Sequence, residues 1–403
     1  MAACSPKAGG TMDFAWTAED AAFAKELDDF LKAELPPWWR GMFTSGERGW
    51  EYTKEFCQKI AKKGWLTMAW PKEYGGGDAS LWKQVIFREA MARAGEPRGS
   101  QYMNTNWIGP TIMQFGTEEQ KRYHLTRISK GDVLWCQGFS EPNFGSDLAS
   151  LQTRAAQDGD DYVINGQKIW TSYAERAEFC FLLARTNQDA PKHKGISVFI
   201  VPMKTRGVTV RPIMSMAGGD DFNEVFFEDV RVPRSAMLGA KDEGWRVVTA
   251  VLNFERIGLA RYEAAKWAVD EVIAYAKRSE THGRSLAKDP LLRQRVADVY
   301  ARYRVARALN YRLASLMSKK GESPGPADAS LTRIHNILMT RRAGDLAMEA
   351  LGLEGRLSEG TADAPLAGML EYEWRKSISA TIAAGTLEIQ KDQVATRGLG
   401  LPR

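Results

Sequence analysis

The sequence predicts an α+β protein with an N-terminal helical domain, a central β-sandwich or β-barrel domain and a C-terminal helical domain. Its 403 residues exceed what one hydrophobic core normally organises. Apolar residues recur at helical spacing near both ends, whereas the middle holds short β-branched and aromatic runs separated by turn residues. We therefore expect a flexible N-terminus followed by three domains, with boundaries at 1–12, 13–131, 132–243 and 244–403.

The N-terminal domain is predicted to begin with a capped helix. Thr17 is followed three residues later by Asp20, which is the pattern of a capping box. Apolar residues then repeat at helical spacing over residues 23–31, until Pro36 ends the helix. The same capping pattern recurs over residues 117–120 and predicts another helix start near the end of this domain.

The central domain is predicted to be all β. Asn165-Gly166 is a dipeptide that tolerates positive φ at both positions of a tight turn, and it predicts a β-hairpin there. Pro233 and Gly239 end the β region. The predicted strands cover residues 162–164, 179–184, 196–201, 208–213 and 224–230.

The C-terminal domain is predicted to be helical. Asp289-Pro290 marks a helix start with proline in the first turn, and an apolar, heptad-like pattern follows over residues 291–317. Further helices are expected from Ala329 and from Thr386. The apolar stripes are wide enough to pack on more than one side, so we expect a dimer or tetramer formed through this domain.

Composition excludes several classes of protein. Apolar residues make up 44% and charged residues 26%, as in globular proteins, and no apolar run approaches a membrane span. Residues 1–10 lack a signal or transit pattern, which predicts a cytoplasmic protein. The net charge of +5 is spread along the chain without a nucleic-acid-binding motif. The four cysteines are far apart, and we expect free thiols.

Motifs of the commoner enzyme classes are absent from the sequence. No GxGxxG follows a predicted strand, and neither GxSxG nor HExxH occurs. The histidines are scattered at positions 124, 193, 282 and 335 rather than clustered. Rossmann-type cofactor binding, serine hydrolysis and metal catalysis are therefore disfavoured.

Two motifs in the β region suit a flat ring with polar edges. Residues 137–147 form a glycine- and hydroxyl-bearing turn tightened by Pro142, and residues 165–172 end in Trp170-Thr171-Ser172. Close backbone donors, a hydroxyl and an indole would suit a flavin. Turn formation and strand packing are the plainer interpretation of each motif in isolation, so the motifs by themselves leave the flavin interpretation open.

A third motif lies near the C-terminus. Gly385-Thr386 precedes a predicted terminal helix as an N-cap, and the amide groups of such a helix start favour an anion or a polar acceptor. Plain helix capping is the alternative interpretation.

In this order along residues 15–402, the three motifs resemble the acyl-CoA dehydrogenase family. The resemblance implies helical, β and four-helix-bundle domains, FAD as cofactor, an acyl-CoA substrate, and electron-transfer flavoprotein as the electron acceptor. It also implies a homo-oligomer, or a heteromer with a sister subunit. The flavin-binding residues that it implies are Gln137, Phe139, Ser140, Gly145, Ser146, Trp170, Thr171, Ser172, Glu349, Gly352, Thr386 and Glu388. The substrate-binding residues that it implies are Ser146, Arg256, Ala384 and Gly385.

The catalytic base implied by the resemblance is Glu255. Many family members carry the base as a Glu immediately before Gly-Thr, but this chain has Ala384 there. Its segment Leu252-Asn253-Phe254-Glu255-Arg256 is similar to the Leu-x-x-Glu-Arg of the isovaleryl and long-chain branches, whose base lies on this middle helix. The apolar neighbours of Glu255 would raise the pKa of its carboxyl group toward a value useful for proton abstraction.

Departures from the family pattern keep two alternatives open. Ser279 and Pro290 stand where the family has an Arg and a Gln, and residues 349–353 depart from its Gln-x-x-Gly-Gly motif, so the hold on the FAD adenosine half is altered. One alternative is a non-catalytic or FAD-sharing subunit of a heteromeric acyl-CoA dehydrogenase. The other is a flavin oxidase or monooxygenase on the same fold. For a dehydrogenase, the many aromatic residues and the position of the base predict a bulky, branched or cyclic acyl group.

Overall fold

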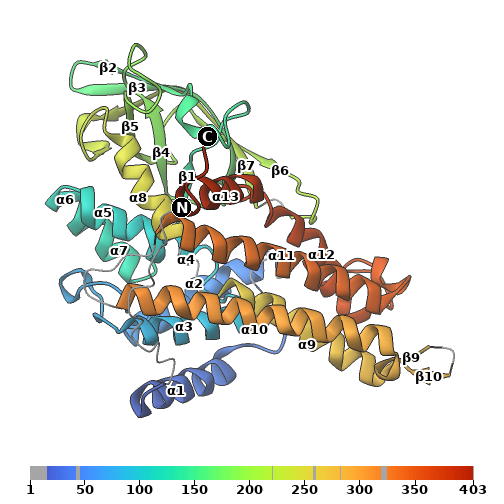
Figure 1. Ribbon diagram of the computed structural model, residues 1–403. Helices are drawn as coiled ribbons and strands as arrows, with labels where there is room; N and C mark the ends of the chain where they lie inside the picture. Colours follow the sequence, from blue (N-terminus) through green and yellow to red (C-terminus); the bar gives the residue numbers. More distant parts are fainter. Residues whose placement is uncertain are drawn as a thin grey trace, which may run out of the picture.

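The computed structural model describes residues 16–41, 46–219, 221–256, 260–281, 283–318 and 325–402 (Figure 1). Within these ranges, only the backbone is described at residues 253–256, 261, 281, 318 and 326. Figure 1 shows the β domain at the top of the view, the long C-terminal helices below it, and α13 between them.

The N-terminal domain is helical, as predicted. Its elements are α1 (Ala18–Glu34), α2 (Gly46–Lys62), α3 (Leu81–Arg93), α4 (Gln101–Met103), η2 (Asn104–Ile108), α5 (Gly109–Phe115), α6 (Glu118–Gln120), η3 (Lys121–Leu125) and α7 (Thr126–Ser129). Both predicted capping boxes are confirmed, at Thr17 with Asp20 and at Thr117 with Gln120. In each of them, side chains satisfy backbone N–H groups that the first helical turn leaves unpaired.

The central domain is one hydrogen-bonded sheet folded on itself. Its strands run in the order β6-β7-β3-β2-β4-β5-β8, with β1 paired to β4. The strands are β1 (Trp135–Gly138), β2 (Arg154–Asp158), β3 (Asp161–Ser172), β4 (Phe179–Arg185), β5 (Ile196–Pro202), β6 (Val208–Ile213), β7 (Phe222–Pro233) and β8 (Met237–Leu238). A buried core combines residues of β3 and β7, such as Ile164 and Phe227, with residues of β4 and β5, such as Leu182 and Phe199. Both halves of the sheet therefore bury their apolar faces against each other.

The hairpin predicted at Asn165-Gly166 is wrong. Both residues lie inside β3, where the pairing with β7 shifts register between Ile164 and Gly166. The turn between β2 and β3 is instead at residues 159–160, because Asp158 pairs with Asp161. A Cβ at Gly166 would come within 2.6 Å of Thr153 Oγ1, so glycine here permits a bulge and a close backbone approach rather than a turn.

The C-terminal domain is a helical bundle. It comprises α8 (Gly244–Arg256), α9 (Arg261–Arg278), α10 (Pro290–Ser318), α11 (Pro326–Leu351), α12 (Met369–Ser379) and α13 (Leu387–Gln393), with a small hairpin of β9 (Glu280–Thr281) and β10 (Arg284–Ser285). The helix starts predicted at Asp289-Pro290 and at Thr386 are confirmed, since Asp289 Oδ1 accepts from Leu291 N at 2.8 Å and Thr386 caps α13. The α+β class with its three parts is therefore confirmed.

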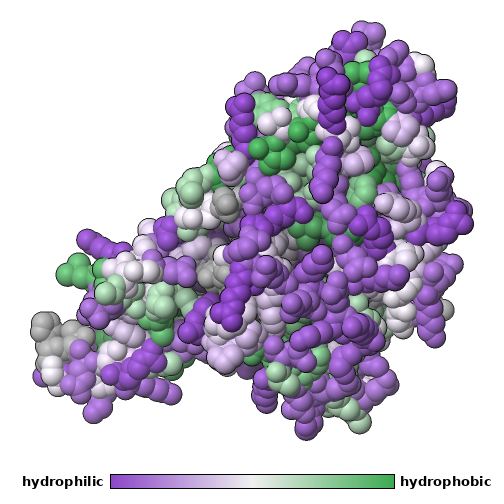
Figure 2. Space-filling model, turned by 180° about the vertical axis from the view of Figure 1, so that it is seen from behind, coloured by the Kyte–Doolittle hydropathy of each residue, from purple (hydrophilic) through white to green (hydrophobic). Residues whose placement is uncertain are grey.

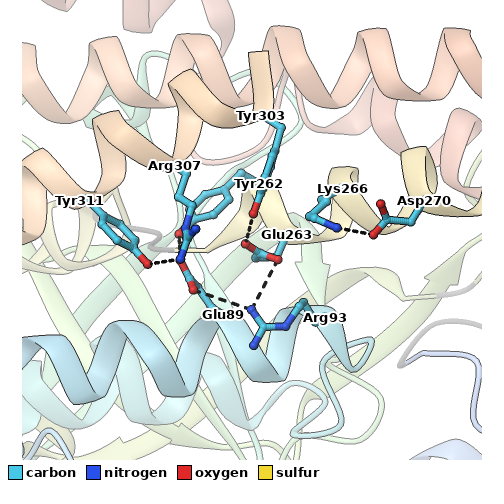
Figure 3. Close-up of polar contacts among 9 residues, drawn as sticks. All are labelled: Glu89, Arg93, Tyr262, Glu263, Lys266, Asp270, Tyr303, Arg307 and Tyr311. Carbon is cyan, nitrogen blue, oxygen red and sulfur yellow. Dashed lines mark hydrogen bonds and ion pairs between the residues drawn. The ribbon is translucent and has the colours of Figure 1, made fainter. Parts of the chain in front are cut away.

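A buried polar cluster joins the N-terminal domain to the C-terminal bundle (Figure 3). Glu89 of α3 and Glu263 of α9 are both 1% exposed. Arg93 Nη1 lies 3.7 Å from a Glu89 oxygen and 3.6 Å from a Glu263 oxygen, while Tyr303 of α10 donates to Glu263 at 2.9 Å. Because the acids and their partners come from three helices, the cluster holds both helical domains in one arrangement.

Two further expectations concern cysteines and membranes. Cys57, Cys136 and Cys180 are buried free thiols, as predicted, and Cys4 lies outside the described residues. Across the described residues, no helix combines the length and the apolar character needed to cross a membrane.

Candidate active site

A bulge at the end of β3 forms the centre of the candidate site. The pairing between β3 and β7 shifts register between Lys168 and Thr171, which releases the intervening residues from the ladder. Trp170 lies in this gap with φ of 59°, in the left-handed region, and 57% of its surface is exposed. A strained backbone of this kind is a reason to consider a functional role for the position, and the exposed indole is available to cover a bound group.

The first three residues of the loop after β1 are held against this bulge by hydrogen bonds. Lys168 Nζ donates to the Phe139 carbonyl at 3.1 Å and to Glu141 Oε1 at 2.8 Å. Between these contacts, the Ser140 carbonyl accepts from Ile169 N at 2.9 Å. The two motifs, about thirty residues apart in the sequence, therefore form one rigid surface that carries both Ser140 and Trp170.

The ion pair that fastens the loop is buried. The Lys168 side chain is 0% exposed and that of Glu141 is 6% exposed. Burial lowers the pKa of Lys168, and Glu141 only partly opposes that shift. Burial raises the pKa of Glu141, but Lys168 and the backbone N–H groups of Gln152 and Thr153, at 2.6 and 2.8 Å, outweigh it and leave the pKa lowered. Sequence reasoning missed both residues, although a Lys and a Glu inside an apolar β region were the available signal.

Unpartnered polar atoms beside the bulge test whether a flavin fits. Among the described residues, Gln137 Nε2 and Thr171 Oγ1 are buried without a hydrogen-bond partner. Each such group costs about 1–3 kcal/mol unless a ligand satisfies it. A flat ring with polar edges that covered the exposed Trp170 would lie beside these atoms, so the residues are compatible with FAD.

The helix that carries the predicted base shares a hydrophobic core with this surface. Phe139 of the loop, Tyr173 after β3 and Leu252 of α8 all pack in or against the same cluster. Glu255 and Arg256 are the last two residues of α8, but their side chains lie outside the described residues. Their predicted roles as base and substrate-binding residue therefore stay predictions.

Tyr173, which sequence reasoning missed, follows the bulge and is influenced electrostatically by two further tyrosines. Tyr173 is buried with φ of 62°, and burial raises its pKa, which the nearby Tyr102 of α4 and Tyr372 of α12 raise further. In addition, Arg375 of α12 donates to the Met216 carbonyl of the β6–β7 loop at 2.7 Å. The N-terminal domain and α12 thus both reach the site, a convergence that no single segment of the sequence signals.

The turn before α13 has a strained backbone, and side-chain hydrogen bonds to its carbonyl groups hold it in place. Ala384 and Gly385 have φ of 55° and 87°. The buried Gln390 donates to both of their carbonyls at 3.3 Å, and Arg333 donates to the Ala383 carbonyl at 2.6 Å. Ala384 has no group that can take a proton, so it cannot replace the glutamate found there in many family members.

The remaining predicted residues divide into two groups. Gly145, Ser146 and Glu388 are exposed, and beside Ser146 the Asp147 carboxylate pairs with Lys192 at 2.9 Å. Glu349 and Gly352 lie at the C-terminal end of α11, and within the described chain Glu349 forms its ion pairs with two arginines of the bundle, at 2.9 and 3.7 Å. One chain therefore does not bring Glu349 to the bulge.

The surface around the β domain is partly apolar. Figure 2 shows hydrophobic residues gathered over the upper part of the rear face, where the β domain lies, above helices that present mainly hydrophilic residues. The exposed large apolar side chains of this domain are Trp170, Met214 and Met216.

Comparison with known proteins identifies the family. Models of the acyl-CoA dehydrogenase N-terminal, middle and C-terminal domains match residues 17–132, 136–230 and 242–399. The acyl-CoA dehydrogenase FadE26 of Mycobacterium tuberculosis is 37% identical over 97% of this chain and 99% of its own length.

Solved structures agree with the sequence match. The ChsE4–ChsE5 complex from Mycobacterium tuberculosis contains a chain with 36% identity and a TM-score of 0.87, over 97% of this chain and all of that one. The steroid ACAD Tcur3481–Tcur3483 gives 34% identity and a TM-score of 0.87 over the same shares. The chain belongs to the acyl-CoA dehydrogenase family and is an FAD-dependent acyl-CoA dehydrogenase.

Proposed function

We propose that this chain oxidises a bulky acyl-CoA thioester between its α and β carbons, with Glu255 as the general base. Bound FAD supplies the hydride acceptor for the β-hydrogen. The observation that supports this proposal best is the β3 bulge, which joins the Ser140 loop, the exposed Trp170 and the unpartnered Thr171 Oγ1 on one surface.

In the proposed reaction, the Glu255 carboxylate takes the α-proton of the thioester. Two features support this role. Ala384 cannot accept a proton, and Glu255 follows Leu252 by one helical turn on α8, the helix that packs in the core beneath Phe139 and Tyr173. Apolar surroundings keep a carboxylate basic enough for proton abstraction.

The flavin ring is assigned to the surface of the bulge. We assign its polar contacts to Gln137, Ser140, Thr171 and Ser172, and the cover of the ring to Trp170. We assign Phe139 to the packing beneath this surface, since its ring contacts Phe181 at 5.9 Å. The predicted cofactor set also contains Gly145, Ser146, Glu349, Gly352, Thr386 and Glu388. The predicted substrate set is Ser146, Arg256, Ala384 and Gly385.

The proposed substrate is a bulky, ring-containing acyl-CoA, and the proposed assembly is a heteromer with a sister subunit. Related chains occur in the ChsE4–ChsE5 complex and in a steroid ACAD made of two named components. Glu349 and Gly352, which the family resemblance places at the FAD adenosine half, lie away from the bulge within one chain, so a second subunit would complete that part. Electron-transfer flavoprotein is the proposed acceptor.

An anaerobic screen tests this function. The chain would be purified alone and after co-expression with candidate sister subunits, and flavin bleaching would be recorded with acyl-CoAs of straight, branched and polycyclic acids. We expect bleaching by a polycyclic thioester, slow reoxidation in air and fast reoxidation by electron-transfer flavoprotein. Fast reoxidation by oxygen would identify an oxidase instead. Bleaching of the complex that Glu255→Gln leaves unchanged would identify this chain as a non-catalytic subunit.

A further inference from the structure

A buried asparagine of β7 lies against the β3 bulge, and the function proposed above assigns it no role. Asn223 is 0% exposed and pairs across the ladder with Thr171, directly after the register shift that forms the bulge. Its Nδ2 donates to the Thr171 carbonyl at 3.1 Å, and this hydrogen bond is itself buried. A polar side chain of the neighbouring strand therefore reaches the backbone of the bulge.

The backbone is strained on both sides of this contact. Trp170 has a φ of 59° and Tyr173 a φ of 62°, both in the left-handed region. Such conformations persist only where the surrounding structure imposes them. Tyr173 N donates to the Asp221 carbonyl at 2.8 Å, which holds one strained residue. Asn223 supplies a second hold, on Thr171, between the two strained positions.

The amide of Asn223 brings a cost to folding as well as a benefit. Its Oδ1 is buried and accepts no hydrogen bond from the described residues. A buried acceptor without a partner has lost its hydration, a cost that a leucine of similar size would avoid. The Nδ2 group is the half of the amide in use, and it reaches the carbonyls of Thr171 and Asp221, at 3.1 and 3.5 Å. What the amide contributes is therefore a hold on this corner of the sheet.

The bond to Thr171 acts on the two side chains that flank it. The Thr171 side chain is 1% exposed, whereas Trp170 is 57% exposed and Ser172 is half-buried. Because successive side chains of a strand point to opposite faces, a bond that fixes Thr171 from inside also sets the direction of its neighbours. Bulges next to active sites often aim side chains in this way.

We propose that Asn223 is a positioning residue for the flavin, which holds the bulge so that Trp170 and Ser172 face the ring. The inference rests on the ring position proposed above. It adds a residue that does not itself touch the cofactor.

Two variants that remove the donor test this role, Asn223→Leu, which keeps the size, and Asn223→Val, which suits a strand. The Kd for FAD, the visible absorption spectrum and the midpoint potential of the bound flavin would be compared with those of the wild type. We expect the Kd to rise roughly two- to tenfold, the factor that corresponds to one net hydrogen bond. The spectrum and the potential should shift with it. A lower Tm with an unchanged spectrum and potential would show a purely structural role and overturn the proposal.

Asn165→Ala is the matched control. Asn165 joins the same two strands at the other register shift, where it donates to the Asp229 carboxylate at 3.0 Å and accepts from Asp229 N at 2.9 Å. It lies ~20 Å from Thr171 along β3, in a part of the strand without a predicted flavin residue. We expect the spectrum and Kd of the wild type. If Asn165→Ala shifts the flavin as Asn223→Leu does, the effect is a general loosening of the sheet and the proposal is wrong.

Trp170→Ala separates this inference from the ring position on which it rests. If Trp170→Ala leaves the flavin spectrum unchanged, the ring does not lie on the bulge, and the ring position and the role of Asn223 both fail. If Trp170→Ala changes the spectrum and the Asn223 variants do not, only the role of Asn223 fails. If neither Asn223 variant folds, a crystal structure of the FAD-loaded wild type decides. A ring against Trp170 and Ser172, with the Asn223 bond intact, supports the proposal, and a ring elsewhere overturns it.

Discussion

Lys168→Met tests whether the buried ion pair shapes the flavin surface. The substitution removes the two contacts of Nζ, at 3.1 Å to the Phe139 carbonyl and 2.8 Å to Glu141, and leaves the buried Glu141 carboxylate without its opposite charge, with only the backbone N–H groups of Gln152 and Thr153 as donors. Breaking a buried pair in this way typically costs ~3–5 kcal/mol. Because the Phe139 carbonyl also loses its donor, the Ser140 loop should shift and the affinity for FAD should fall.

Two measurements separate the effect on protein stability from the effect on the position of the Ser140 loop. The free energy of unfolding would be measured by denaturant titration of the apoprotein, and the Kd for FAD by fluorescence. The double variant Lys168→Met, Glu141→Gln removes both charges, so it should recover much of the stability while its affinity for FAD stays low. Lys192→Met is the matched control, because it breaks an exposed pair with Asp147 in the same region, and should cost ~1 kcal/mol or less.

The reasoning would be refuted by a Lys168→Met protein within 1 kcal/mol of the wild type that binds FAD with unchanged affinity. Recovery of both stability and FAD affinity in the double variant would show instead that the pair acts on folding alone.

Three further predictions follow from the site and its surroundings. Glu255→Gln should slow reduction of the flavin by substrate by ~10²–10⁴-fold, with flavin content retained, and near-wild-type rates in rapid mixing would exclude Glu255 as the base. Trp170→Ala should weaken FAD binding without lowering the Tm of the apoprotein, since the indole is largely exposed; equal losses in both would indicate a purely structural role. Burial, and then Glu89, raises the pKa of Glu263. Its ionised form is therefore disfavoured in the folded state, and wild-type stability should fall relative to Glu263→Gln as pH rises from its ordinary pKa of 4.5; a pH-independent difference in unfolding free energy would contradict this.

The local sequence determined the helix starts and their caps. The capping boxes at Thr17 and Thr117, the proline start of α10 and the N-cap at Thr386 were predicted correctly, because each depends on side chains that reach backbone groups a few residues away. The three-part organisation also followed from periodicity. The order of the motifs identified the family and FAD, while the domain boundaries and the base stay predictions.

Only the tertiary structure decided how these pieces meet. Asn165-Gly166 is compatible with a turn or a bulge, and pairing of β3 with β7 selected the bulge. Lys168 and Glu141 are 27 residues apart, and Glu89 and Tyr262 are 173 apart, so no spacing along the chain reveals that they pair. Such contacts form because burial forces a charged side chain to find whichever partner the packed domains bring near it, and that partner is set by the fold as a whole.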